Sequence, residues 1–140
     1  MATRSGAGGA CGLGAALKAF LGGTLKSGSE TVLDLVGFNE RLEGVSLVVT
    51  GEGATDWQSV YGKVMQGVGM RCKAQKIPAS AIVGSMGQGA EDIFDYGIDS
   101  IITTVNRPMA LAEAVDKAEE LYLGAARRMF RMLRAGIKMK

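Results

Sequence analysis

Three short apolar runs rich in β-branched residues constrain the fold of this chain most strongly. They cover residues 46–50, 79–83 and 100–105. None of them alternates cleanly between apolar and polar positions, which is typical of strands that are covered on both faces. A helical pattern follows each run, and this repeated strand–helix order predicts a parallel sheet with right-handed crossovers.

The segments between and after the runs predict the helices that would cover this sheet. We expect a long loop and a helix within residues 51–76, a shorter helix over residues 89–96, and a long helix over residues 109–134. The last helix is electrically polarised, because its acidic residues come early and its basic residues come late. This order suits the helix dipole, and a phosphate-binding or nucleic-acid-binding tail is the alternative interpretation.

Two further helices are predicted ahead of the first strand. Apolar residues recur three or four apart over residues 13–21, and the glycine pair at 22–23 should end that helix. A second helix is expected from Ser29, a suitable N-cap, to Val36, with Gly37 as its stop.

These patterns predict a single α/β segment over residues 1–140, a parallel-sheet, Rossmann-like three-layer unit. A glycine-rich loop and helices occupy residues 1–44, and a β-α-β-α-β-α unit occupies residues 45–140. With 47% hydrophobic and 21% charged residues, the 140-residue chain has the composition of a globular protein and can bury a core.

Composition also excludes several function classes. The chain has no histidine, which leaves no basis for a typical zinc site or a His-based triad. A net charge of +2 and 6% aromatic residues disfavour nucleic-acid binding. There is no apolar run of membrane-spanning length and no signal-peptide pattern, so we expect a cytoplasmic protein without a membrane partner, its two cysteines reduced.

The first candidate site is the glycine-rich segment over residues 6–14, which holds five glycines ahead of a predicted helix. Backbone N–H groups at a helix N-terminus attract anions, and glycine lets a phosphate or carboxylate approach the chain closely. Gly6, Gly8 and Gly9 are the candidate binding residues. The segment matches neither a Walker A motif nor a dinucleotide fingerprint, and a flexible tail is the alternative.

The second candidate site follows the first predicted strand, where open α/β sheets place their ligands. Glu52 and Asp56 supply two carboxylates in a loop loosened by Gly51 and Gly53. Carboxylates in such a number suit Mg²⁺, which also takes phosphate oxygens as ligands. The hydroxyls of Thr55 and Ser59 and the amide of Gln58 complete this candidate binding set.

Lys63 stands where the next helix is predicted to begin. A lysine in a first helical turn opposes the helix dipole, but it becomes useful if an anionic ligand binds there. A phosphate or substrate carboxylate would meet that condition. The alternative is a capping box formed by Thr55 and Gln58, on a helix that carries Lys63 as a solvated charge.

Two more turns follow the second and third predicted strands. The glycine-rich turn at residues 84–89 carries Ser85, and it would lie beside the first strand's loop if the two strands are neighbours. A plain tight turn is the alternative there. Arg107 follows the third strand and could clamp a phosphate at the same sheet edge, or it could be an exposed surface arginine.

These segments together resemble the bacterial glycerate kinases. Residues 6–17, GAGGACGLGAAL, resemble the family's GAGAAGGLGAAL, and residues 20–28 resemble its AFLGAxLxxG. Residues 47–53, LVVTGEG, resemble LVITGEG, and the spacing from Asp56 to Lys63 resembles D-x-Q-[ST]-x-x-G-K. The resemblance covers nearly the whole chain in uninterrupted order, including the turn that begins AIVGS and the GIDS ahead of the last strand.

The resemblance implies ATP-dependent, Mg²⁺-supported phosphorylation of D-glycerate to phosphoglycerate. Asp56 and Lys63 become candidate catalytic residues, and Glu52 and Asp56 become candidate metal ligands. Ala54 departs from the family's arginine-like residue, and Met65 departs from its proline, which would remove a charge contact and change the entry to the helix.

Chains of this family are considerably longer, with further strands and an inserted second domain that closes the active cleft. The resemblance therefore implies the C-terminal part of a two-domain kinase, which lacks one wall of the cleft. A non-catalytic module is the alternative function, binding a small ligand or associating with itself, because an open strand edge would invite pairing with a second copy.

Overall fold

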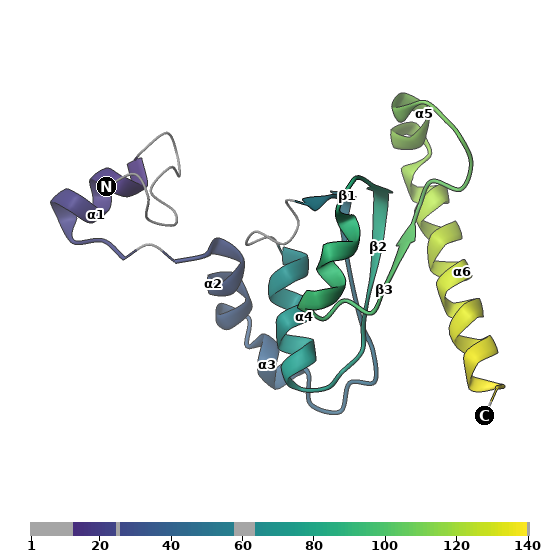
Figure 1. The fold of residues 1–140 in the computed structure, drawn as a ribbon, viewed down its shortest axis with the longest axis horizontal. Coiled ribbons are helices and arrows are strands. Elements are labelled where there is room, and N and C mark those ends of the chain that lie inside the picture. Colours follow the sequence, from purple (N-terminus) through teal and green to yellow (C-terminus); the bar gives the residue numbers. More distant parts are fainter. Residues whose placement is uncertain (1–12, 25, 58–63, 140) are drawn as a thin grey trace.

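A computed structural model describes residues 13–24, 26–57 and 64–139 of the chain (Figure 1). The helices are α1 (Leu13–Leu21), α2 (Gly28–Leu35), α3 (Phe38–Arg41), α4 (Val64–Ala74), the 3₁₀ helix η3 (Ala90–Tyr96), α5 (Leu111–Asp116) and α6 (Ala118–Ile137). The strands are β1 (Val48–Thr55), β2 (Ala79–Met86) and β3 (Ser100–Thr103).

The three strands form one parallel sheet, as the sequence predicts, and their order in it is β1-β2-β3. Val48 of β1 pairs with Ala79 of β2, and Ser80 of β2 pairs with Ser100 of β3. The first five residues of β2 are all buried, because this strand has a neighbour on each side and helices over both faces. β2 is therefore the centre of the fold.

Helices cover the two faces of the sheet and complete the three predicted layers. On one face, alternate residues of β2 pack with the buried side of α4 and with Ile93 of η3. On the other face, Ile82 packs with Ala125 and Met129 of α6. α2 and α3 lie on the α4 side, as Figure 1 shows. The expected α/β fold is thus confirmed.

The first strand is longer than predicted. We expected it to end at Thr50 with a glycine-rich loop after it, but β1 continues to Thr55. The reason is that Gly51 and Glu52 keep their register with Ile82 and Val83 of β2. Two glycines that locally favour a turn are held extended by backbone hydrogen bonds to a buried neighbour. Glu52 is therefore a strand residue.

The long C-terminal helix is also different from the prediction, because it is two helices that meet at Lys117. α5 lies beyond the carboxyl ends of the strands, next to the start of α6, and α6 runs down beside β3 (Figure 1). The third strand ends at Thr103, two residues earlier than expected. η3 is a 3₁₀ helix, entered and left through left-handed glycines at Gly89 and Gly97.

The helices near the N-terminus agree with the prediction in part. α1 has the predicted limits, but its apolar residues are exposed, with Phe20 at 85%. α2 begins one residue earlier than expected, because Ser27 and not Ser29 is its N-cap. Gly37 follows the end of α2 in the left-handed conformation, as its role as a stop requires.

Candidate functional site

The turns that follow β1 and β2 lie side by side at the carboxyl edge of the sheet. The Gly87 N–H donates to the carbonyl oxygen of Thr55 at 2.7 Å, and the Trp57 N–H donates to the carbonyl oxygen of Gln88 at 3.0 Å. The prediction that the two candidate turns are neighbours is therefore confirmed. Residues from two separate segments can act on one ligand at this edge.

Glycine is required where the strands approach this edge. A Cβ built on Gly51 would lie 2.2 Å from the carbonyl oxygen of Ile82, which no side chain can tolerate. By contrast, a Cβ on Gly53 would meet no atom within 4 Å. The absence of a side chain at Gly51 therefore serves strand pairing, whereas at Gly53 it leaves space beside the sheet.

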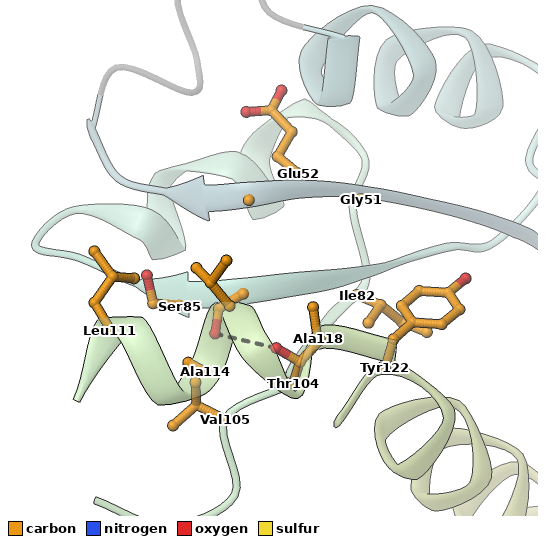
Figure 2. Close-up of a pocket in the computed structure, with 13 residues that line it drawn as sticks. Gly51, Glu52, Ile82, Ser85, Thr104, Val105, Leu111, Ala114, Ala118 and Tyr122 are labelled. Atoms are coloured by element: carbon orange, nitrogen blue, oxygen red, sulfur yellow. Dashed lines mark hydrogen bonds between the residues drawn. The ribbon is translucent and has the colours of Figure 1, made fainter. Parts of the chain in front are cut away.

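That space belongs to a pocket of about 550 Å³ between the sheet and the last two helices (Figure 2). Its base is the backbone of β1 and β2, including Gly51, Gly53 and Gly84. Its wall is apolar and comes from α5 and α6, through Leu111, Ala114, Val115, Ala118 and Tyr122. Among the described residues that line it, those with a hydroxyl group are Tyr122, Ser85 and Thr104.

Glu52 contributes to this pocket without placing its carboxylate in it. Figure 2 shows the side chain pointing away from the apolar wall, toward the other side of the sheet. The register agrees, because Glu52 pairs with Val83, whose side chain belongs to the core under α4 and η3. The predicted metal ligand and the pocket therefore lie on opposite faces of β1.

Asp56 begins the turn after β1 and rests against the neighbouring turn. A Cβ on Gly87 would be 3.2 Å from the Cβ of Asp56, and one on Gly89 would be 2.9 Å from the Cβ of Trp57. Thr55, which precedes them, is fully buried, and its Oγ1 has no hydrogen-bond partner within the described part of the chain. The glycines of the second turn thus make room for the first.

Several predicted site residues fall outside the described residues. These are Gly6, Gly8, Gly9, Gln58, Ser59 and Lys63. Val64 is the first described residue of α4, and the helix start that the sequence predicts beside Lys63 lies outside the described residues.

Arg107 is engaged with a residue of this chain. Its guanidinium and the ammonium of Lys117 both bond to Oε1 of Glu113, the latter at 3.1 Å. These hydrogen bonds, from Lys117 first and Arg107 second, hold the pKa of Glu113 below its ordinary value. The three side chains link the segment after β3 to α5, and all of them are partly exposed, with the Arg107 side chain at 55%.

The apolar wall is the part of the site that the sequence analysis missed. Leu111, Val115 and Tyr122 have the spacing of a helix face, and that spacing predicted packing against the sheet. All three are more than half exposed because the helices meet the sheet only lower down, at Ala125 and Met129. A run of small residues opposite the wall, Gly51, Gly53 and Gly84, was the available signal for a cavity.

Among the described residues, no three Asp, Glu or Cys side chains come together as a metal-binding group. Mg²⁺ requires less, since one or two carboxylates with phosphate oxygens and water suffice, and Glu52 and Asp56 fit that donor set. None of the helices within the described ranges has the length and apolar character to cross a membrane.

Comparison with known proteins shows which family this chain resembles. The glycerate kinase family model matches residues 1–134. Glycerate kinase of Halalkalibacterium halodurans is 45% identical over 91% of this chain and 33% of its own length. Glycerate 2-kinase of Escherichia coli is 38% identical over 95% of this chain and 35% of its own.

A solved structure agrees with these relatives. The crystal structure of glycerate kinase 2 from Salmonella typhimurium has a TM-score of 0.70 and 34% identity, over 95% of this chain and 34% of that one. This chain therefore spans about a third of the length of the proteins that it matches.

Proposed function

Because this chain belongs to the glycerate kinase family, we propose that it carries part of an active site that phosphorylates D-glycerate to phosphoglycerate with ATP and Mg²⁺. One observation supports this proposal above the others. The turns after β1 and β2 are hydrogen-bonded to each other at the carboxyl edge of a parallel sheet. Asp56 lies in the first of these turns, and Lys63 follows it shortly afterwards in the sequence. Open α/β sheets bind ligands at this edge.

Phosphoryl transfer depends mainly on positioning and on the stabilisation of charge. We assign Asp56 to hold the metal or to accept the proton of the attacking hydroxyl, and Lys63 to neutralise the transferring phosphoryl group. Glu52 is the second candidate carboxylate for the metal. When bound, Mg²⁺ would neutralise phosphate charge and orient the oxygens.

The apolar pocket suits a different part of the nucleotide. No charged side chain projects from its wall, and Glu52 points away, so it offers little to a phosphate or a carboxylate. Its volume of about 550 Å³ and the adjacent Tyr122 suit a flat, weakly polar ring system. We assign the pocket to the purine base, which leaves the phosphates to the edge near Asp56.

A fluorescence titration tests the site without requiring turnover. Trp57 is the single tryptophan of the chain, is 54% exposed and adjoins Asp56. We expect MgATP to change its emission, and Asp56→Asn to weaken that binding about tenfold or more, since a charge-assisted contact is lost. Asp116→Asn on α5 is the matched control. Equal affinities in all three proteins would contradict the role of Asp56.

Adenosine, which carries no phosphate, tests the pocket separately. Gly53 lines the pocket, and a Cβ there would meet no atom within 4 Å, so we expect Gly53→Val to occupy part of the pocket and to lower adenosine binding. Gly53→Val could leave adenosine binding unchanged while MgATP binding still depends on Asp56. That result would contradict the assignment of the pocket to the base and would still support the kinase site.

A non-catalytic module is the second candidate function. It is favoured by the apolar lining of the pocket and by the Glu52 side chain, which points away from it. A coupled ADP-release assay with D-glycerate distinguishes the two functions. Turnover that disappears with Asp56→Asn supports the kinase, whereas ligand binding without turnover supports the module.

A further inference from the structure

α6 carries a second apolar stripe that is mostly exposed, although Ala126 within it is half-buried and packs against the core of Ile82, Ala125 and Met129. Its first stripe faces the sheet through Leu121, Ala125 and Met129, all of them buried. The second stripe lies on another side of the helix and contains three large side chains at 48%, 54% and 73% exposure, Leu123, Phe130 and Ile137. Ala126 and Leu133 fill the positions between them, and we call these five residues the α6 seam.

The seam has the spacing of a coiled-coil surface. Its members are separated by three, four, three and four residues, from Leu123 to Ile137. This alternation keeps apolar side chains on one line facing a partner helix, as the a and d positions of a heptad do. It is therefore a surface shaped for another helix, and a seam of this length spans about 21 Å along the axis.

Charges beside the seam select the partner and its direction. Glu120, Arg127 and Arg134 are spaced by seven residues and so follow one edge of the seam. Two parallel copies would place Glu119 and Glu120 of one helix next to the same acids of the other. Antiparallel copies would bring Glu120 to Arg134 of the partner subunit, twice in a two-fold symmetric pair.

Side-chain size agrees with the antiparallel arrangement. When Glu120 lies next to Arg134 of the partner subunit, Ala126 faces Phe130 of the partner subunit. By symmetry this contact occurs twice near the middle of the helix pair, and each time a small residue meets a large one. Leu123 then faces Leu133 of the partner subunit. Arg127 lies close to the symmetry axis and meets its own counterpart, which weakens the pair.

We propose that α6 pairs antiparallel with α6 of a second copy of this chain. The surface is separate from the candidate active site and the proposal does not depend on the proposed function. One helix pair lies at the small end of stable interfaces, so we expect a dimer that dissociates at concentrations on the order of micromolar.

Sedimentation velocity over a range of concentrations is the first test. The parent chain should show concentration-dependent dimers, and Phe130→Glu should weaken dimerisation at least about tenfold, because it places a charge in the seam. Met132→Glu is the matched control, since Met132 lies on the same helix, is 72% exposed and is outside the seam. A parent that stays monomeric, or a dimer that Phe130→Glu leaves unchanged, overturns the proposal.

Charge reversal tests the antiparallel direction. The doubly substituted chains Glu119→Arg/Glu120→Arg and Arg127→Glu/Arg134→Glu should each lose self-association, because like charges then meet at both ends. Mixed together, they should form heterodimers tighter than the parent dimer, since the repulsion between the two Arg127 side chains is also removed. Heterodimer formation would show that both variants fold.

Two further outcomes would overturn the proposal. If each reversed variant self-associates as well as the parent does, the charges do not set the pairing. If the parent is monomeric and the seam becomes protected only when the remaining two thirds of a longer glycerate kinase is added, that segment is the occupant.

Discussion

Gly84 of β2 lies directly against the carbonyl group of Gly53 of β1, so that a Cβ on Gly84 would be 2.2 Å from the Gly53 oxygen. This contact holds the two candidate turns together at the edge of the sheet. We expect Gly84→Ala to lower the free energy of unfolding by about 1–3 kcal/mol, because the strands must separate to admit the methyl group. Gly53→Ala, which meets no atom, should change it by less than about 0.5 kcal/mol. Chemical denaturation measures both, and equal losses would contradict the contact.

Arg71 of α4 should hold α2 in place. Its guanidinium donates to Glu30 at 2.7 Å and to Asp34 at 2.6 Å, and these hydrogen bonds raise the pKa of Arg71. Because both carboxylates are substantially exposed, we expect Arg71→Met to cost only about 1 kcal/mol. Hydrogen exchange should quicken selectively in α2. Arg131→Met on α6 is the control, and unchanged exchange in α2 would rule out this role.

Glu113 should make stability depend on pH. Hydrogen bonds from Lys117 and Arg107 lower its pKa from the ordinary 4.5, so its stabilising effect is present above that value and is lost as pH falls through the lowered pKa. Glu113→Gln should therefore lower the melting temperature near neutral pH and converge with the parent in acid. Glu91→Gln is the exposed control. A difference that persists at low pH would indicate lost packing instead.

Cys72 should react slowly with alkylating reagents. It is fully buried in the core under β2, and burial first and the charge of Asp99 second raise the pKa of its thiol. In a Cys11→Ser background, we expect labelling by iodoacetamide to be limited by opening of the structure and to accelerate in denaturant. Labelling of the native protein at the rate of a free thiol would show that the core near α4 opens readily.

The sequence was most informative where local pattern and tertiary structure agree. The runs at 46–50, 79–83 and 100–105 did become three parallel strands, because a buried central strand leaves a continuous apolar run. The sequence placed the turns after β1 and β2 next to each other only on the condition that the two strands are neighbours, and the structure meets that condition.

Other features depended on contacts that a local pattern does not contain. Gly51 and Gly53 favour a turn by themselves, and only pairing with β2 extends them into a strand. The break between α5 and α6 at Lys117 falls at neither a glycine nor a proline, so no residue there predicts the end of a helix. Arg107 was a candidate phosphate ligand, and its pairing with Glu113 depends on where α5 lies.

The central position of β2 has a kinetic consequence. Neither of its neighbours is close to it in sequence, because a helix-containing crossover separates β1 from β2 and another separates β2 from β3. A chain closure must be made before either pair of strands gains any hydrogen bond, and contacts so distant in sequence slow folding. Until then β2, the most apolar of the three described strands, has two unpaired edges. We therefore expect aggregation during refolding to begin at β2 and to compete with folding most strongly at high protein concentration.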